Sequence, residues 1–453
     1  MKKINLDKNF YKKLFVIGIP IMIQNLISSS LNMVDTLMIG KLGDESIAAV
    51  GLSNQVFFLF TLILFGVFSG ASIFTAQFYG KKDIKNIRRV LSVCLMSGIF
   101  VAIIFTFFVL VFPKEILGIF SKDLKVINLG ADYIFIVGFS YILTSISFAY
   151  SFSARSIGQA KIPMVVSGIA LACNTILNYI LIFGEFGFPE LGVKGAAYAT
   201  LISRIVEIIL ILSIVYKLDL AIAARWKDLC DVSLEFILKI YKTAFPVIIN
   251  ESFWALGMTA YSRAYARMST EAIASVQIGN SVQNLFLVFS MGLGNACAVM
   301  LGHEIGKGKE ENAIAYSKKY YYVGFIISII LGVVLFFSAN NIISYFNVSD
   351  KVAKNSVYIL KIISLFLWAK TFNMITIVGV LRSGGDTKFA MFTELGTIWL
   401  YGVPIVMLSA LYFKFPIYIV ILLANFEEVI KLFIGIPRVI SKKWVNNIIE
   451  EID

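Results

Sequence analysis

The chain has 453 residues, of which 58% are hydrophobic and 15% charged, and its mean hydropathy is +0.84. Soluble domains are about 25% charged, so the composition excludes an ordinary soluble protein and indicates that most of the surface faces lipid. Lysine and arginine total 40 against 28 aspartates and glutamates. In a soluble protein that excess of basic residues would suggest binding to nucleic acid. Here the basic residues gather in alternate loops, so no nucleic-acid partner is expected.

Twelve apolar stretches follow one another along the chain, separated by short breaks that are charged or contain glycine or proline. Crossing the hydrocarbon core takes roughly 20 apolar residues per helix, and these stretches are long enough. The sequence therefore predicts an all-α polytopic membrane protein embedded in a lipid bilayer. The twelve predicted transmembrane helices cover residues 13–39, 47–78, 90–112, 128–153, 162–184, 193–217, 240–266, 272–301, 319–340, 354–381, 389–411 and 416–440.

The basic residues predict how these helices are oriented. They concentrate at the N-terminus, in alternate loops and in the C-terminal tail, for example at Lys81–Lys82, Arg88–Arg89 and Lys442–Lys443. Because cytoplasmic loops are enriched in lysine and arginine, we expect both termini in the cytoplasm and a multi-pass protein in the cell membrane. The first stretch has no small-residue cleavage site, so it is expected to remain as a helix and not to be removed as a signal peptide.

The second half of the chain repeats the first. At a shift of 226 or 227 residues, the matched pairs include Pro20 with Pro246, Asn54 with Asn280, and Arg155 with Arg382. Six helices per repeat is an even number, so both repeats enter the membrane from the same side and are related by a pseudo-two-fold axis along the membrane normal. The predicted lobes are residues 1–217 and 240–453, joined by a mildly amphipathic linker, residues 218–239, on the cytoplasmic surface.

The first predicted helix carries an acid on a polar face. Gln24, Ser28, Asn32 and Asp35 are spaced by four, four and three residues, which places them on one side of a helix. An ionised side chain is costly in hydrocarbon, so this face is expected to meet a water-filled cavity or polar partners. A carboxylate among neutral oxygens can bind sodium, or a proton when desolvation favours the neutral acid. The alternatives are an acid held by packing hydrogen bonds, or one at the outer interface, since Gly40 follows soon after.

The seventh predicted helix carries a second acid, Glu251, five residues after Pro246. A proline frees a backbone carbonyl and can kink the helix, which is common beside ion sites. Asn250 and Trp254 lie close to this acid, and a carboxylate near an aromatic ring suits a hydrophobic cation. The alternative is a salt bridge within the lobe, for which Lys370 is the expected partner.

Other charged residues inside the predicted helices have simpler interpretations. Arg204 and Glu207 are three residues apart, and Glu427 and Lys431 are four apart, so each pair can form within one helix. Glu394 lies near the cytoplasmic end of its helix and is expected to face the headgroups.

Two arginines occupy equivalent places in the repeat. Arg155 and Arg382 end matching helices on the cytoplasmic side, each followed by small residues and a lysine. We interpret them as gate or topology determinants, although a plain anchoring role is equally open. Pro20 and Pro246 are interpreted as structural or gating residues of the first and seventh helices.

The sequence lacks the motifs of enzymes and ATP-driven pumps. It contains no Walker loop and no G-x-S-x-G, and His303-Glu304 lacks the second histidine of H-E-x-x-H. The four cysteines are scattered without metal-binding spacing. We therefore expect no enzymatic activity, no metal and no cofactor, with energy taken from an ion gradient.

Several motifs resemble the multidrug and toxic-compound extrusion (MATE) transporters over essentially the whole chain, with mixed features of the NorM-like and DinF-like branches. The segments that carry the resemblance are Pro20 with Gln24, Val34–Gly43, Ala48–Gly51, Ala76–Gly80, Asn174–Tyr179, Gly195–Ala197, Pro246 with Glu251, and Leu381–Lys388. The resemblance implies a V-shaped pair of six-helix bundles that exports organic cations or drug-like molecules against an inward flow of protons or sodium. A monomer is expected.

The resemblance also implies a coupling-ion site in the first half of the chain. In one branch of the family, an acid at the position of Asp35 joins residues of the fifth and sixth helices, which match Asn174, Asn178 and Thr200 here. That branch has a second acid where this chain has Asn178. The choice between sodium and proton, and the stoichiometry, therefore stay open.

In the second half, the resemblance implies that Glu251 works with an acid in the tenth helix. Counting back from Arg382 places Thr371 at that position, with Lys370 beside it, so the two-acid site is incomplete. The residues assigned to substrate or proton binding are Gln24, Asn32, Asn250, Glu251, Trp254, Tyr261, Asn280 and Thr371.

The two acids occupy different places in the repeat. The shift of 226 pairs Asp35 with Tyr261 and Glu251 with Asn25. Measured from the matched prolines, ten residues at about 1.5 Å each separate the two acids in depth by roughly 15 Å. We therefore hypothesise that one acid holds the coupling ion while the other engages substrate or a second proton.

Two other functions are compatible with parts of this pattern. A flippase of a lipid-linked or polyanionic precursor would share the two-lobe plan, but its cavity should be lined by arginine and lysine, whereas this chain offers Asp35 and Glu251 among mostly neutral groups. A membrane-embedded enzyme or receptor would need a catalytic constellation or an extramembrane domain, and the sequence has neither.

Overall fold

The computed structural model of the chain describes residues 8–346 and 348–450, and every regular element in this part is a helix. The residues group into two compact units. The N-unit is Ile23–Ala244, and the C-unit combines Met1–Met22 with Phe245–Asp453. The boundaries fall inside two long helices, α1 (Lys8–Gly40) and α10 (Leu234–Met268).

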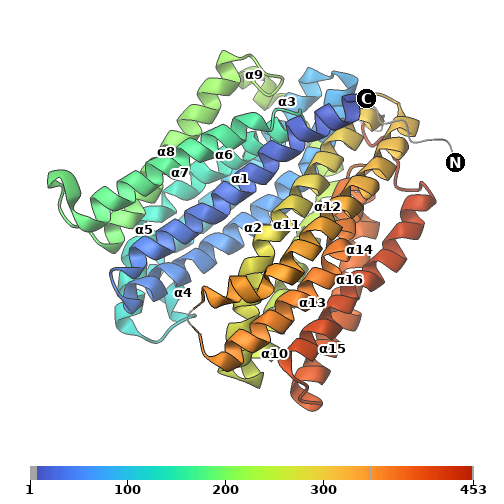
Figure 1. The fold of residues 1–453 in the computed structure, drawn as a ribbon. Coiled ribbons are helices and arrows are strands. Elements are labelled where there is room, and N and C mark those ends of the chain that lie inside the picture. The colour runs from blue at the N-terminus through green and yellow to red at the C-terminus, as the bar shows by residue number, and fades with distance from the viewer. Residues whose placement is uncertain (1–7, 347, 451–453) are drawn as a thin grey trace. The chain divides into compact units, whose positions relative to one another are not determined.

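The N-unit holds α1 from Ile23 onward and the helices that follow it in the chain as far as the start of α10. Apart from the short α4 and α9, these helices overlap the first six predicted stretches. After α1 these helices are α2 (Asp44–Lys81), α3 (Ile84–Val111), α4 (Pro113–Gly118), α5 (Leu124–Gly138), α6 (Ser140–Ser156), α7 (Lys161–Phe183), α8 (Val193–Lys217) and α9 (Trp226–Cys230), with a 3-10 turn, η1 (Glu185–Gly187), after α7. α2 packs on α3, α5 and α6, and α7 packs on α8 (Figure 1). α5 and α6 together correspond to one predicted span, which is bent by 50° between them.

Local sequence signals set several helix ends in the N-unit. The carboxylate of Asp83 accepts a hydrogen bond from the backbone N–H of Asn86 at 3.0 Å and so caps the start of α3. Pro113 stands at the first position of α4, where its missing N–H costs nothing. Gly184 ends α7 with a φ of 73°, a left-handed conformation that glycine adopts without strain.

The segment between α8 and α10 is held to the start of α3 by ion pairs. Arg88 contacts Asp228 at 3.0 Å, and Arg89 contacts Asp231 at 2.8 Å. Lys85 contacts the same Asp231 carboxylate at 3.2 Å. The hydrogen bond from Arg89, together with Lys85, holds the pKa of Asp231 below its ordinary value. α10 begins at Leu234, so the last residues of the predicted linker are already helical.

The C-unit is built from the remaining helices. After α10 they are α11 (Thr270–Gly306), α12 (Glu310–Ser344), α13 (Asp350–Met374), α14 (Thr387–Thr397), α15 (Val403–Met407) and α16 (Ile417–Ile440), with π-helical segments η2 (Ile375–Leu381), η3 (Ile398–Gly402) and η4 (Leu408–Tyr412). α12 and α13 lie side by side, α11 packs on both, and α16 packs on α13 and α14 (Figure 1). A π-helical turn takes in an extra residue and so re-aims the side chains that follow it.

The helices differ in how well their composition suits a membrane. In the part of the chain that the structure describes, nine helices are long and apolar enough to cross a membrane, or ten if the bent pair α5 and α6 forms one span. α10 and α16 are not among the nine. Both carry charge in mid-helix, Glu251 in α10 and Glu427, Glu428 and Lys431 in α16. The predicted all-α class is confirmed, and the two helices outside this apolar set carry Glu251, Glu427, Glu428 and Lys431, whose contacts are described below.

Candidate functional site

The carboxylate of Asp35 in α1 meets two asparagines of α7. Asn178 Nδ2 donates to Asp35 Oδ1 at 2.5 Å and to Asn174 Oδ1 at 3.1 Å. The two asparagines are one turn apart on the same face of α7, and both are buried. Asn178 Oδ1 has no hydrogen-bond partner among the described residues. The structure thus brings together the acid and the two amides that the sequence singled out, with one unpartnered amide oxygen near a partly buried carboxyl.

A tyrosine that the sequence did not single out lies beside this group. Tyr133 of α5 is 5% exposed, lies near Thr200 of α8, and interacts electrostatically with Asp35 and Arg204. Arg204 also contacts Glu207 at 2.6 Å, which confirms the pair expected within that helix. Thr200 and Asp35 are thus both neighbours of Tyr133. Nothing in the sequence separates Tyr133 from the other tyrosines, of which the chain has 20.

The rest of the predicted polar face of α1 is described only in part. Gln24 is buried and its Nε2 donates to Ser167 Oγ of α7 at 3.2 Å, while its Oε1 has no partner among the described residues. Ser28 turns back to the carbonyl of Gln24 at 3.1 Å. The side chain of Asn32 lies outside the part of the chain that the structure describes.

In the C-unit, Glu251 is engaged in a salt bridge. Arg382 Nη2 donates to Glu251 Oε1 at 2.7 Å, and Arg382 is 4% exposed. The alternative interpretation, a salt bridge inside the lobe, is therefore what the structure shows, but the partner named for it, Lys370, was wrong. Lys370 instead donates to Gln283 Oε1 at 3.0 Å. Arg382 follows the π-helical η2, whose extra residue changes the direction of the side chains after it.

The two arginines matched by the repeat differ in their surroundings. Arg382 is buried against Glu251 of another helix. Arg155 stays on its own helix, where its Nε donates to the Ser151 carbonyl at 3.4 Å and its guanidinium lies 4.3 Å from the centre of the Phe152 ring. Equivalent positions in the sequence thus hold one ion-paired and one ring-stacked arginine.

A buried charged group surrounds Lys431 of α16. Its Nζ lies 2.6 Å from Glu427 Oε1 and 3.8 Å from Glu428 Oε2. The predicted pair of Glu427 and Lys431 is confirmed. Asn373 of α13 donates to Glu428 Oε2 at 2.7 Å, and Tyr261 of α10 donates to Glu427 Oε2 at 2.5 Å. Tyr261 is the repeat counterpart of Asp35. Where the N-unit has the acid Asp35 in its first helix, the C-unit has a tyrosine that contacts the Glu427 carboxylate of α16.

Glu394 of α14 does not stand where the sequence predicted. It was expected to face the headgroups, but it is partly buried and its Oε2 accepts a hydrogen bond from Asn250 Nδ2 at 2.5 Å. Asn250, assigned to the substrate or proton site, is 2% exposed. The assignment to the headgroups was wrong because position along a helix does not reveal which neighbouring helix covers it.

Five other predicted site residues lie apart from these contacts. Thr371 is buried and shares a 2.8 Å hydrogen bond with Ser290 of α11. Trp254 is 36% exposed, and Asn280 is also exposed. Among the residues that the structure describes, none of these three forms a hydrogen bond or ion pair with Glu251. Pro20 and Pro246 lie inside α1 and α10.

Gly402 in η3 allows Tyr261 to reach Glu427. A Cβ at this position would overlap the Tyr261 hydroxyl and would also lie about 2.5 Å from Glu427 Oε2. We expect Gly402→Ala to lower the stability by about 1–3 kcal/mol, the usual cost of overpacking, measured as a lower Tm of the purified protein. Gly396→Ala is the matched control, since nothing lies within 4 Å of its added Cβ. An unchanged Tm for Gly402→Ala would contradict the close approach.

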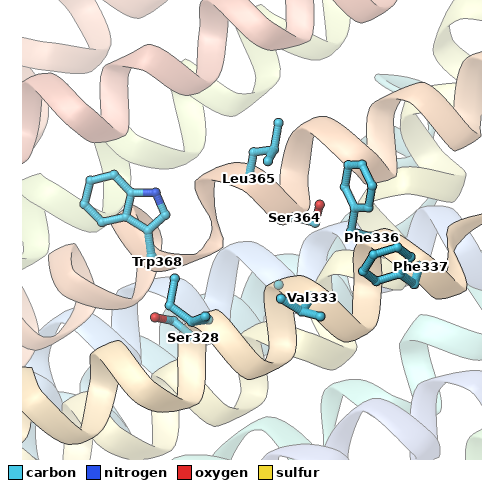
Figure 2. A pocket seen from close by; sticks show the side chains of 9 residues that line it. Ser328, Val333, Phe336, Phe337, Ser364, Leu365 and Trp368 are labelled. Carbon is cyan, nitrogen blue, oxygen red and sulfur yellow. The ribbon is translucent and has the colours of Figure 1, made fainter.

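A separate pocket lies between α12 and α13. Figure 2 shows its lining side chains, which include Val333, Phe336, Phe337, Leu365 and Trp368. The cavity volume is about 260 Å³, and Ser328 and Ser364 are its only side chains with polar atoms apart from the Trp368 indole. It holds none of the predicted site residues and offers no charge to a cation, so the candidate site lies with the carboxyl groups.

The fold and these carboxyl groups define a multi-pass membrane protein with ionisable groups inside its helices, a feature typical of transporters. The MatE family model matches residues 20–180 and 246–408, more than two thirds of the chain, and the chain belongs to this family. The two matched segments begin at Pro20 and Pro246, which are the prolines that the internal repeat aligns. The predicted family membership is confirmed.

Individual relatives are similar over nearly the whole chain. The probable multidrug resistance protein NorM of Thermotoga maritima is 27% identical over 413 residues, covering 89% of this chain and 86% of that protein. The uncharacterized transporter YisQ of Bacillus subtilis is 24% identical over 409 residues, covering 90% and 89%. A crystal structure of a mutant of the Vibrio cholerae MATE transporter VcmN matches the fold with a TM-score of 0.86 at 17% identity, covering 96% of this chain and 98% of that chain.

Proposed function

We propose that this chain is a secondary-active exporter of hydrophobic or cationic small molecules, exchanging them for H⁺ or Na⁺. The observation that carries the proposal is the Asp35 carboxylate, held by Asn178 inside the helices of a MatE-family chain. A negative charge inside the hydrocarbon region has a high free energy unless a cation balances it. A carboxylate between membrane helices can therefore bind a cation and release it when its surroundings change. The names of the NorM relatives, which describe multidrug resistance, support the choice of substrate.

The proposal includes an architecture of twelve transmembrane helices in two parallel repeats. The supporting observation is that the family model matches twice, beginning at the two aligned prolines. In this arrangement residues 1–217 and 240–453 form the lobes, residues 218–239 form a cytoplasmic linker, and both termini are cytoplasmic. We place the protein in the cell membrane as a monomer.

We assign different roles to the two acids. Asp35, with Asn174, Asn178 and Thr200, would hold the coupling ion, because the side-chain amides of the two asparagines lie beside its carboxylate. Glu251 would engage the cationic substrate or a second proton. Since Arg382 already balances Glu251, a cationic substrate must compete with the guanidinium for the same carboxylate. Binding and release of substrate would then be linked to movement of Arg382.

Transport in everted membrane vesicles tests this function directly. A fluorescent hydrophobic cation is added outside vesicles that contain the chain, and proton and sodium gradients, each higher inside, are imposed separately. We expect the cation to accumulate inside when the gradient of the coupling ion is present and to leave when it is collapsed. Vesicles without the chain are the control. Accumulation that continues after both gradients have been collapsed would contradict ion-coupled export.

A further inference from the structure

One cluster of buried and partly buried charged groups in the C-unit does not balance. The groups that face one another on α10, α13, α14 and α16 and at the end of η2 are the acids Glu251, Glu394, Glu427 and Glu428 and the bases Lys370, Arg382 and Lys431. Four carboxyl groups thus face three cationic groups. If all were ionised, the group would carry one excess negative charge inside the helices, where an unbalanced charge is costly.

The contacts identify which of the four carboxyl groups has no cationic partner of its own. Arg382 is 2.7 Å from Glu251, and Lys431 is 2.6 Å from Glu427. Glu428 lies 3.8 Å from Lys431 and also interacts electrostatically with Lys370.

Glu394 is left without an ion pair among the residues that the structure describes. Its charged neighbours are Lys431, Glu251 and Arg382, and both of those cations already contact another carboxylate. Its one direct polar contact in the described part of the chain is the amide of Asn250. The balancing positive charge must therefore come from outside this set of side chains.

Asn250 indicates what that charge is. Its Nδ2 donates to Glu394, but its Oδ1 is buried with no hydrogen-bond partner among the described residues. Buried polar atoms are nearly always hydrogen-bonded, so an unpartnered acceptor points to a missing donor. An ionised carboxylate has no donor to offer, whereas a protonated carboxyl has one O–H. With a proton on Glu394, the acid and the amide can form two complementary hydrogen bonds, N–H to the carboxyl and O–H to Asn250 Oδ1.

We propose that Glu394 and Asn250 form a proton-binding site, in which Glu394 takes up the one proton that balances this cluster of charges. Glu394 is only partly buried, so the proton can be exchanged with water. The inference rests on the proposed function in one respect, because an exporter coupled to protons would use this site in its transport cycle. The Glu394 site would give the C-unit a proton site although position 371 holds a threonine and not the acid that the resemblance implies.

Infrared difference spectroscopy tests the site without requiring transport. The full-length protein is purified, placed in lipid nanodiscs, and compared between alkaline and acidic buffer, where each carboxyl that takes up a proton gives a C=O band. We expect Glu394→Gln to lose one such band. Glu304→Gln is the matched control and should keep that band, because Glu304 is paired with Lys307 at 2.7 Å. A wild-type band that persists unchanged in Glu394→Gln would overturn the proposal.

Two further variants keep the test decisive. If Glu394→Gln fails to fold, Glu394→Asp retains a carboxyl on a shorter side chain, and we expect the band to remain at a different frequency. Asn250→Leu removes the acceptor for the O–H, so the band should also change frequency; no change would contradict the pairing. The infrared spectrum does not depend on export, so the two proposals are tested separately. If only the Glu394 site is wrong, Glu394→Gln keeps the band while export is still observed. If only the export function is wrong, Glu394→Gln loses the band while no export is observed.

Discussion

Asp35→Asn is expected to lower ion-driven export at least about tenfold, with the protein still present in the membrane at its normal level. The substitution keeps the size of the side chain but removes its charge. Hydrogen bonds to charged groups are worth about 1.5–3 kcal/mol, and a loss of about 1.4 kcal/mol is already tenfold in binding. The measurement is gradient-driven accumulation of the fluorescent cation in everted vesicles, normalised to the amount of protein.

Asp132→Asn is the control for the loss of Asp35. Asp132 belongs to the same unit, but its side chain is 52% exposed and its contact with Lys194 is a surface ion pair at 3.2 Å, which contributes little. Asn178→Ala should cause a smaller loss than Asp35→Asn, because it removes one donor to the carboxylate and keeps the charge. Export by Asp35→Asn at the wild-type rate would refute the assignment of Asp35 to the coupling ion.

The helices of this fold could be predicted from the sequence because their cause is local. An apolar stretch of about 20 residues in lipid must satisfy its backbone hydrogen bonds within itself, so it forms a helix. The cost of an ionised side chain in lipid predicted Asp35 as a site residue, and the family resemblance added Asn178. The structure brings the two residues together at 2.5 Å. The bend between α5 and α6 and the π-helical turns were not predicted, because they depend on packing against other helices.

The partners in the C-unit could not be predicted, because they depend on which helices are neighbours. Sequence spacing reveals pairs within one helix, and Glu427 with Lys431 was found in that way. The partner of Glu251 comes from a different helix. The sequence contains both Lys370 and Arg382 as basic residues that could pair with it, and sequence spacing does not distinguish them. For Glu394, the deciding fact was the contact with Asn250, which lies 144 positions away in the chain. Long-range contacts of this kind leave no signal in one sequence.

Lys431→Met is expected to be the most destabilising single substitution in the C-unit. It removes the cation that lies 2.6 Å from Glu427 and 3.8 Å from Glu428, and it leaves two neighbouring carboxylates without that compensation. Breaking a buried ion pair by removing one partner costs about 3–5 kcal/mol. The measurement is the Tm of the purified protein in one fixed detergent. Lys351→Met is the control, because Lys351 is 69% exposed and its contact with Glu271 is 3.6 Å long, so only a small change is expected.

A second substitution separates loss of charge from loss of packing. In Glu427→Gln combined with Lys431→Met, the glutamine is neutral and can still accept the hydrogen bond that Tyr261 donates to Glu427. Removing both partners of a buried pair costs far less than removing one, so the double variant should recover most of the lost Tm. If it is no more stable than Lys431→Met alone, the lysine stabilises the unit through its aliphatic chain, and charge balance does not govern this part of the protein. Charge balance would then not explain a proton on Glu394 either, since Glu394 and Lys431 belong to the same cluster of charges.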